Sequence, residues 1–163
     1  MIRRALQTDL SAIAQINRLS FSGNKPVGMA EKWVSSHFAQ GDQYHYFVFE
    51  DDAGIGGYIS WEMRGGFARE VPVIELEQLA VHPDFRGKGV GGTLVNETFH
   101  VMKQWMHQNQ PLAKQMRVFV WTKKDNDKAK AIYLGICNEG EKGQRDIYGS
   151  EEVLLRGVYD LMG

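Results

Sequence analysis

Four glycines lie within six residues in the segment Arg86-Gly87-Lys88-Gly89-Val90-Gly91-Gly92, shortly after a strand-like run. Because glycine has no Cβ, the backbone N–H groups of such a segment can approach a ligand closely. Where a helix begins, these donors lie at the positive end of the helix dipole and bind anions, most often phosphates. Arg86 and Lys88 add positive charge. We therefore predict a phosphate-binding site at this turn.

Two common phosphate motifs do not describe the turn. A P-loop needs Gly-x-x-x-x-Gly-Lys-Ser/Thr, which no register of the segment supplies. The dinucleotide pattern Gly-x-Gly-x-x-Gly is met by Gly87, Gly89 and Gly92. That pattern should follow its strand directly and have an acidic residue about twenty positions on. Here residues 82–85 separate strand from turn, and residues 107–112 contain no acid, so we interpret the match as accidental.

Two acidic side chains on a predicted strand are the second chemical feature. Glu75 and Glu77 lie in the run Val73–Val81, and the two-residue period of a strand places both on one face. A carboxylate on a central strand is costly to bury unless it is paired or used. We expect each of them either to take part in the chemistry or to pair with a basic side chain.

Composition favours a cytoplasmic globular protein with no membrane partner. The chain has 163 residues, 43% of them hydrophobic, and its 19 basic and 20 acidic residues nearly cancel, which disfavours a general nucleic-acid binder. The single cysteine, Cys137, excludes an intrachain disulfide and fits a reducing compartment. No apolar run approaches the roughly 20 residues of a membrane span, and the N-terminus lacks the apolar core of a signal peptide.

Periodicity and turn residues predict one α+β domain over residues 1–163. Its mixed, twisted sheet should have six to seven strands flanked by about four helices. Helices are expected at about 10–21, 29–38, 92–108 and 125–134, and strands at 1–5, 44–50, 57–63, 73–81, 116–122 and 152–159. Thr8 or Asp9 should cap the first helix, and Trp33 should be buried in the second. Residues 138–145 are a poor strand by propensity, so a strand there should be short, shifted toward Ile147-Tyr148, or replaced by a loop.

The turn also meets a third pattern, Gln/Arg-x-x-Gly-x-Gly/Ala, through Arg86, Gly89 and Gly91. With this pattern, the run from Glu77 to Gly91 resembles the acetyl-CoA signature of the GNAT superfamily of N-acyltransferases. A second feature of that family, Asn126-x-x-Ala129-x-x-x-Tyr133, follows on the helix after the next strand. The order of elements also agrees over nearly the whole chain. Because motifs, spacing and order point the same way, the resemblance is specific.

The resemblance implies an enzyme, an N-acetyltransferase that moves an acetyl group from acetyl-CoA directly to a primary amine. The main chain of Leu79, Ala80 and Val81 would hold the pantetheine arm. Asn126 would contact the cofactor near the pantetheine, or it would only cap its helix. The pyrophosphate would be held by the turn, that is by Arg86, Gly87, Lys88, Gly89, Val90, Gly91 and Gly92.

The resemblance also assigns the catalytic groups. Tyr133 matches the family's general acid, which protonates the departing thiolate, although a tyrosine at helical spacing can also be a core residue. Glu77 matches a glutamate that binds or deprotonates the amine in several members, and Glu75 is the second candidate. No metal is implied, and His100 and His107 have no third ligand spaced to complete a metal site.

Some questions stay open at this point. A catalytically silent acyl-CoA-binding sensor or interaction module with the same fold is the alternative function. The acceptor can be a polyamine-like molecule, an aminoglycoside, an amino acid or a protein N-terminus. The sequence also leaves open a homodimer, and whether an acyl group other than acetyl is used.

Overall fold

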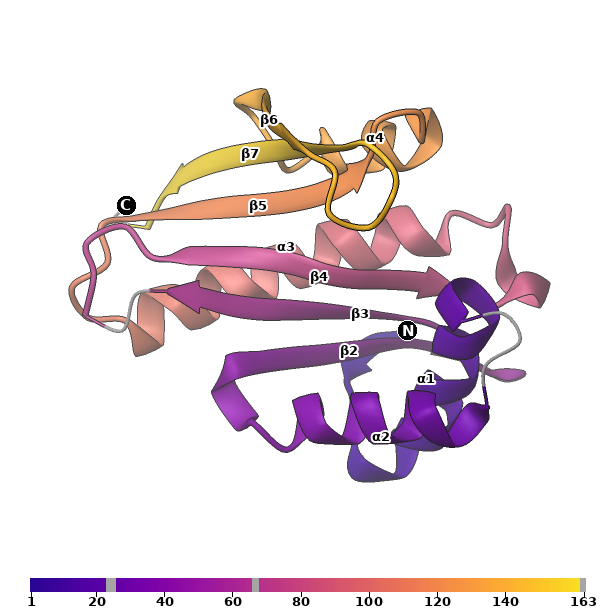
Figure 1. The fold of residues 1–163 in the computed structure, drawn as a ribbon. Coiled ribbons are helices and arrows are strands. Elements are labelled where there is room, and N and C mark those ends of the chain that lie inside the picture. The colour runs from indigo at the N-terminus through magenta and orange to yellow at the C-terminus, as the bar shows by residue number, and fades with distance from the viewer. Residues whose placement is uncertain (23–25, 66–67, 162–163) are drawn as a thin grey trace. The chain divides into compact units, whose positions relative to one another are not determined.

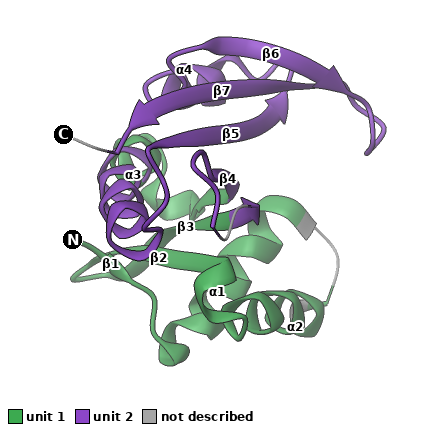
Figure 2. Cartoon of the chain, turned by 90° about the vertical axis from the view of Figure 1, so that its left-hand side faces the viewer, with its two compact units in different colours: residues 1–62, 78–94 green, residues 63–77, 95–163 purple. Residues whose placement is uncertain are grey.

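The computed structural model describes residues 1–22, 26–65 and 68–161 and consists of two compact units (Figure 2). Unit 1 comprises residues 1–62 and 78–94, and unit 2 comprises residues 63–77 and 95–163. Three elements belong to both units. Strand β3 (Gly54–Gly65) passes from unit 1 to unit 2, strand β4 (Val73–Val81) passes from unit 2 to unit 1, and helix α3 (Val90–Asn109) passes back to unit 2.

Unit 1 combines antiparallel strands with two helices (Figure 1). Strand β2 (Tyr44–Asp51) pairs antiparallel with β1 (Ile2–Arg4) on one side and with β3 (Gly54–Gly65) on the other. Helices α1 (Leu10–Asn17) and α2 (Val27–Phe38) contact each other. Apolar residues of these elements form one buried cluster, which includes Ile13, Ile16, Val34, Tyr46, Val48, Tyr58 and Ala80.

A buried polar network attaches α1 to the second half of β4. The Asn17 side-chain amide donates to the Tyr58 hydroxyl at 2.9 Å, and that hydroxyl donates to Gln78 Oε1 at 2.8 Å. Asn17 also donates to Gln78 Oε1 at 3.2 Å. Buried polar groups are stable only when hydrogen-bonded, so this network fixes the part of β4 that leads toward the glycine turn.

Unit 2 contains the parallel part of the sheet. Strands β4 and β5 (Gln115–Lys123) pair in parallel from Val73–Arg117 to Leu76–Val120. Strand β7 (Glu152–Asp160) lies antiparallel between β5 and β6 (Gly140–Arg145). Helix α4 (Asp127–Tyr133) connects β5 to β6. The strand order is β1-β2-β3-β4-β5-β7-β6.

Seven strands and four α-helices in the described residues confirm the predicted α+β class with a mixed sheet. Most boundaries agree within a few residues, but α3 begins at Val90, two residues earlier than predicted. Residues 140–145 form β6 despite their poor propensity, because they pair along β7. Ile147 and Tyr148 lie outside any strand. Within the described part of the chain, no helix has the length and apolarity needed to cross a bilayer.

The predictions for the N-terminal helices were confirmed only in part, and one was wrong. Asp9 is the N-cap residue of α1 as predicted, but its side chain makes no capping hydrogen bond, because it accepts hydrogen bonds from Arg3 at 2.7 Å and from the Leu6 amide at 2.7 Å. The hydrogen bond from Arg3 is the main cause that lowers the pKa of Asp9. Trp33 is 50% exposed rather than buried, and its ring lies 4.3 Å from that of His37.

The turn after β4 is held in place by an aromatic contact within unit 1. Phe85 ends a short 3-10 helix (Pro83–Phe85), and its ring lies directly over the backbone of Gly56. The His82 amide donates to the Gly56 carbonyl at 2.8 Å. A Cβ at Gly56 would overlap with the Phe85 ring, so glycine is needed there for close approach.

We predict that Gly56→Ala lowers the free energy of unfolding by about 1–3 kcal/mol, because the added methyl group overpacks against Phe85. Gly28→Ala is the matched control, since a Cβ at Gly28 meets nothing within 4 Å and alanine is favoured inside a helix. Urea unfolding measures both variants. Equal stability of Gly56→Ala and the wild type would contradict the packing of Phe85 on Gly56.

Candidate functional site

The glycine turn in unit 1 is built for close approach to its backbone. Gly87 has φ 77° and Gly89 has φ 76°, a left-handed conformation that residues with a Cβ rarely adopt. A Cβ placed on Gly87, Gly89 or Gly92 would have open space around it. The outer side of the turn therefore presents main chain rather than side chains.

The start of α3 supplies the hydrogen-bond donors. The Thr93 amide and the Thr93 hydroxyl both donate to the Gly89 carbonyl, at 3.1 and 2.9 Å. Gly89 is thus the residue at which the intrahelical hydrogen bonds begin. The N–H groups of Val90, Gly91 and Gly92 precede the first of these bonds and need another acceptor. An anion with several oxygen atoms suits them, because they lie at the positive end of a 20-residue helix.

The two basic side chains of the turn are held near it. Arg86 Nε donates to the Val81 carbonyl at 3.1 Å, so this side chain folds back along the end of β4. Lys88 Nζ lies 5.5 Å above the centre of the Phe85 ring. Both residues are exposed. Their positive charges therefore add to the N-terminal end of α3 without being neutralised by a carboxylate in a described ion pair.

The predicted pantetheine strand ends in unit 1. Ala80 is buried in the unit 1 cluster, whereas Leu79 and Val81 are half-buried. Alternation between buried and half-buried residues holds from Val73 to Glu77 and then stops, because Glu77, Gln78 and Leu79 are all half-buried. The alternation thus ends close to where the pairing of β4 with β5 ends, at Leu76.

The acidic candidates lie in unit 2 and differ in their surroundings. Glu75 is paired in register with Phe119, and its carboxylate lies 3.3 Å from Arg64 Nε. The side chain of Glu75 is only 12% exposed. The sequence allowed either acid to pair with a basic side chain, and the structure shows this pairing for Glu75. Glu77 follows the last residue of β4 that pairs with β5.

Helix α4 positions the other two candidates in unit 2. Asn126 is the N-cap of α4, and its side-chain oxygen accepts from the Ala129 amide at 3.1 Å. Tyr133 is the last residue of α4 and only 9% exposed. Burial raises the pKa of Tyr133 to about 12. Its hydroxyl therefore stays protonated at any physiological pH.

The structure groups the predicted residues into two sets. Unit 1 holds the donors of the glycine turn together with residues 79–81, and unit 2 holds Glu75, Glu77, Asn126 and Tyr133. Cys137 is buried and burial raises its pKa to about 12, which suits a packing role. Within the described residues, no three His, Cys, Asp or Glu side chains gather closely enough to hold a metal ion.

Sequence reasoning missed two sets of residues. One is the contact between Gly56 and Phe85, for which a glycine in a strand was the only signal. The other is the side chain of Arg145, whose Cζ lies 4.1 Å from the centre of the Trp121 ring. Trp121 and Arg145 belong to no common motif in the sequence, so no local pattern predicted the contact between them.

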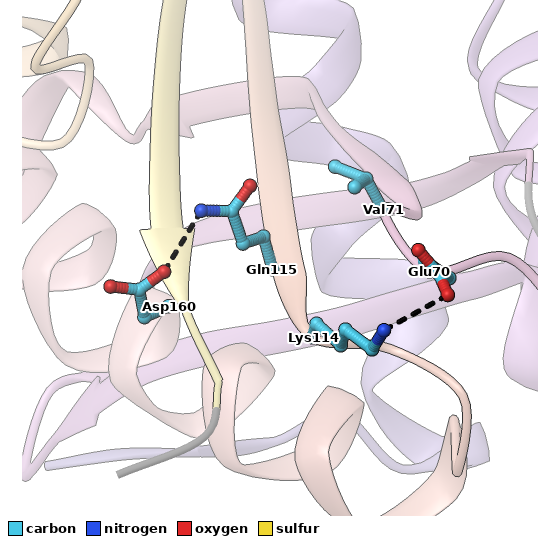
Figure 3. A pocket seen from close by; sticks show the side chains of 5 residues that line it. All are labelled: Glu70, Val71, Lys114, Gln115 and Asp160. Atoms are coloured by element: carbon cyan, nitrogen blue, oxygen red, sulfur yellow. Dashed lines mark hydrogen bonds and ion pairs between the residues drawn. The ribbon is translucent and has the colours of Figure 1, made fainter.

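Unit 2 also has a shallow pocket of about 330 Å³ lined by Glu70, Val71, Lys114, Gln115 and Asp160 (Figure 3). Its polar groups already have partners, because Lys114 Nζ lies 3.0 Å from Glu70 and Gln115 donates to Asp160 at 2.9 Å. None of the predicted site residues lines it. We therefore assign no role in the chemistry to this pocket.

Comparison with known proteins identifies the family. The model of the acetyltransferase (GNAT) family matches residues 10–136, which are more than half of the chain. The chain therefore belongs to this family, as the glycine turn and the Asn126–Tyr133 spacing indicated. The matched residues include the glycine turn, both glutamates and Tyr133.

Individual relatives are more distant. An N-alpha-acetyltransferase of Sulfurisphaera tokodaii is 28% identical over 109 residues, which cover 63% of this chain and 62% of that protein. The matched part thus spans less than two thirds of this relative's length.

Solved structures share the fold. The ribosomal-protein-S18-alanine N-acetyltransferase of Escherichia coli has a TM-score of 0.74 at 19% identity, covering 100% of this chain and 96% of that one. The yncA protein of Salmonella typhimurium, solved with its cofactor acetyl-CoA, has a TM-score of 0.66 at 17% identity, covering 100% and 94%. These likenesses establish the GNAT fold.

We predict that Gly89→Asp raises the dissociation constant for acetyl-CoA at least about tenfold, because it puts a negative charge and a strained φ at the helix N-terminus. Gly41→Asp is the control, since Gly41 also has a positive φ of 60° and open space around a Cβ. Calorimetric titration with acetyl-CoA compares the two. Unchanged affinity in Gly89→Asp would show that the turn does not hold the pyrophosphate.

Proposed function

We propose that the protein is an acetyl-CoA-dependent N-acetyltransferase that transfers the acetyl group directly to a primary amine. The observation that carries this proposal is the glycine turn at the head of α3, with its left-handed Gly87 and Gly89 and its first-turn amides. Membership of the acetyltransferase (GNAT) family supports the same activity.

Acetyl-CoA, when bound, supplies an acetyl group activated as a thioester. The amides of Val90, Gly91 and Gly92 are assigned to its pyrophosphate, with Arg86 and Lys88 adding charge. Arg86 uses Nε for the Val81 carbonyl, which leaves the other end of its guanidinium for a phosphate oxygen. The main chain of residues 79–81 is assigned to the pantetheine arm, and Asn126 to a contact near it.

We assign Glu77 to the acceptor amine. A primary amine has a pKa near 10 and must lose a proton before it can attack a thioester. Glu77 matches the glutamate position of the family, and it lies where β4 stops pairing with β5, two residues before Leu79. Glu75, whose carboxylate lies 3.3 Å from Arg64 Nε, is the second candidate.

Tyr133 is assigned to the departing sulfur. A thiol has a pKa near 8.5, well below the value of about 12 for Tyr133. Full transfer of the phenolic proton to a thiolate is therefore uphill. The hydroxyl is better suited to donate a hydrogen bond to the sulfur as its negative charge develops, which stabilises the transition state. Donation to charge that the bound thioester lacks lowers the barrier without tightening substrate binding, and the departing thiolate then takes its proton from water.

Three features of the protein stay predictions from its sequence: a single domain over residues 1–163, a cytoplasmic location and the absence of a nucleic-acid partner. The acceptor also needs an experiment. The relative from Sulfurisphaera tokodaii is named an N-alpha-acetyltransferase, and the Escherichia coli structure is named for alanine of a ribosomal protein. We therefore include α-amines among the acceptors to be tested.

Release of free thiol from acetyl-CoA tests the activity. The purified full chain is mixed with acetyl-CoA and a panel of amino acids, polyamines, aminoglycosides and short peptides with a free N-terminus. We expect amine-dependent thiol release with at least one class. Tight binding of acetyl-CoA with no release on any amine would instead support a catalytically silent sensor.

For this hydrogen-bond donor, we predict that Tyr133→Phe lowers kcat about 100-fold and leaves the KM for acetyl-CoA nearly unchanged. Because the pKa of Tyr133 is raised to about 12, its protonated form persists as the pH rises. The wild-type kcat should therefore not fall between about pH 8 and 10.

The control for this variant is Tyr159→Phe. Tyr159 also lies in unit 2, but its hydroxyl donates to the Ile136 carbonyl at 2.7 Å, so it should keep the wild-type kcat. The measurement is the rate of thiol release by the wild type and both variants across the pH range. A kcat for Tyr133→Phe equal to that of Tyr159→Phe would make Tyr133 a packing residue.

A further inference from the structure

The guanidinium of Arg145 lies over an aromatic ring in unit 2. Arg145 is the last residue of β6, and its Cζ lies 4.1 Å from the centre of the Trp121 ring on β5. Its Nε lies 3.0 Å from Glu152 Oε1. The side chain is 26% exposed. Stacking and the ion pair together hold the guanidinium in one orientation.

Most hydrogen-bond donors of this guanidinium are not used within the described residues. A guanidinium has five N–H donors, and the Nε–H to Glu152 is the side-chain hydrogen bond that the structure shows for Arg145. The two terminal nitrogens carry the remaining N–H groups. A pair of parallel N–H groups fixed in a plane matches the two oxygens of a carboxylate.

The register of the strands places Arg145 on the same face as the proposed amine site. Glu75 pairs with Phe119, so these side chains share a face of the sheet. Glu77 and Trp121 are each two residues further along the same strands, and the burial alternation of β4 holds as far as Glu77. A two-residue step keeps the face. The Trp121 ring, with the guanidinium on it, therefore lies on the face from which Glu77 projects.

We infer that the acceptor is a free amino acid, whose carboxylate binds Arg145 and whose amine is deprotonated at Glu77. This inference rests on the proposed function, because it names the substrate of that reaction. An acid and a guanidinium on one face of the sheet match the two charged ends of a zwitterion.

The other acceptor classes fit this pair of charges less well. A polyamine would bring a second positive charge to Arg145. A peptide N-terminus offers a neutral carbonyl where the amino acid has a carboxylate, and hydrogen bonds between two charged groups are about twice as strong as neutral ones. The terminal nitrogens of Arg145, which the hydrogen bond to Glu152 does not use, thus favour an anionic group beside the amine.

Binding without chemistry provides the first test. Calorimetry or ligand-observed NMR, with free CoA present, compares each amino acid with its carboxamide, which keeps the amine and the side chain but loses the negative charge. We expect the wild type to bind at least one acid about tenfold more tightly than its amide. Arg145→Gln should abolish this preference, and Arg145→Lys should restore part of it.

Matched variants separate recognition from folding. Arg117→Gln removes a positive charge from the same face of β5 and should keep the preference for the acid. Thermal melting checks that Arg145→Gln and Arg145→Lys are folded. The inference is wrong if the wild type and all folded variants bind the acid and the amide with equal affinity. In that case Arg145 only holds the β6–β7 hairpin together.

Turnover provides the second test and separates the two proposals. With acetyl-CoA and the same pairs, Arg145→Gln should raise the KM for the acid about tenfold and leave the KM for the amide and for acetyl-CoA unchanged. Preference for the acid in binding, with no thiol release on any acceptor, would overturn the acetyltransferase proposal but keep the carboxylate site. Efficient turnover of polyamines or peptides, with Arg145→Gln affecting all acceptors equally, would overturn the carboxylate site alone.

Discussion

The ring of Phe85 on the backbone of Gly56 decides where β4 ends and where α3 begins. With no side chain at Gly56, the ring comes close enough to the strand to hold the 3-10 turn of residues 83–85. The hydrogen bond from the His82 amide to the Gly56 carbonyl fixes the same place from the backbone. The position of the following glycines, and of the first amides of α3, depends on this anchor.

The two halves of the proposed reaction depend on different kinds of chemical groups. The acetyl-CoA half, as proposed, relies mainly on main-chain amides, which every residue except proline has, so its main requirement is a helix start without obstructing side chains. The acceptor half uses side chains from strands β4, β5 and β6, and these come together only through pairing. Glu75 illustrates the difference, because its carboxylate lies 3.3 Å from Nε of Arg64 on β3, a contact that no local pattern records.

Predictions from local propensity were wrong where strand pairing or a tertiary contact stabilised another arrangement. The segment Gly140–Arg145 has two glycines and no β-branched residue, yet it forms β6 because five of its six residues pair with β7. Asp9 was a good candidate for a helix cap, but the guanidinium of Arg3 binds its carboxylate with two hydrogen bonds, at 2.7 and 3.0 Å. A charged partner brought near by folding thus outweighed a local preference.

The sequence by itself determined most of the elements, their order, the family resemblance and the glycine turn, since each depends on residues close together along the chain. Helical and strand periods, the spacing from Asn126 to Tyr133 and the run after Phe85 are all of this kind. Only the tertiary structure decided which charges are paired and which side chain covers Trp121. Arg145 and Trp121 are 24 positions apart in the sequence. They meet because β5 and β6 both pair with β7, and no local pattern records that arrangement.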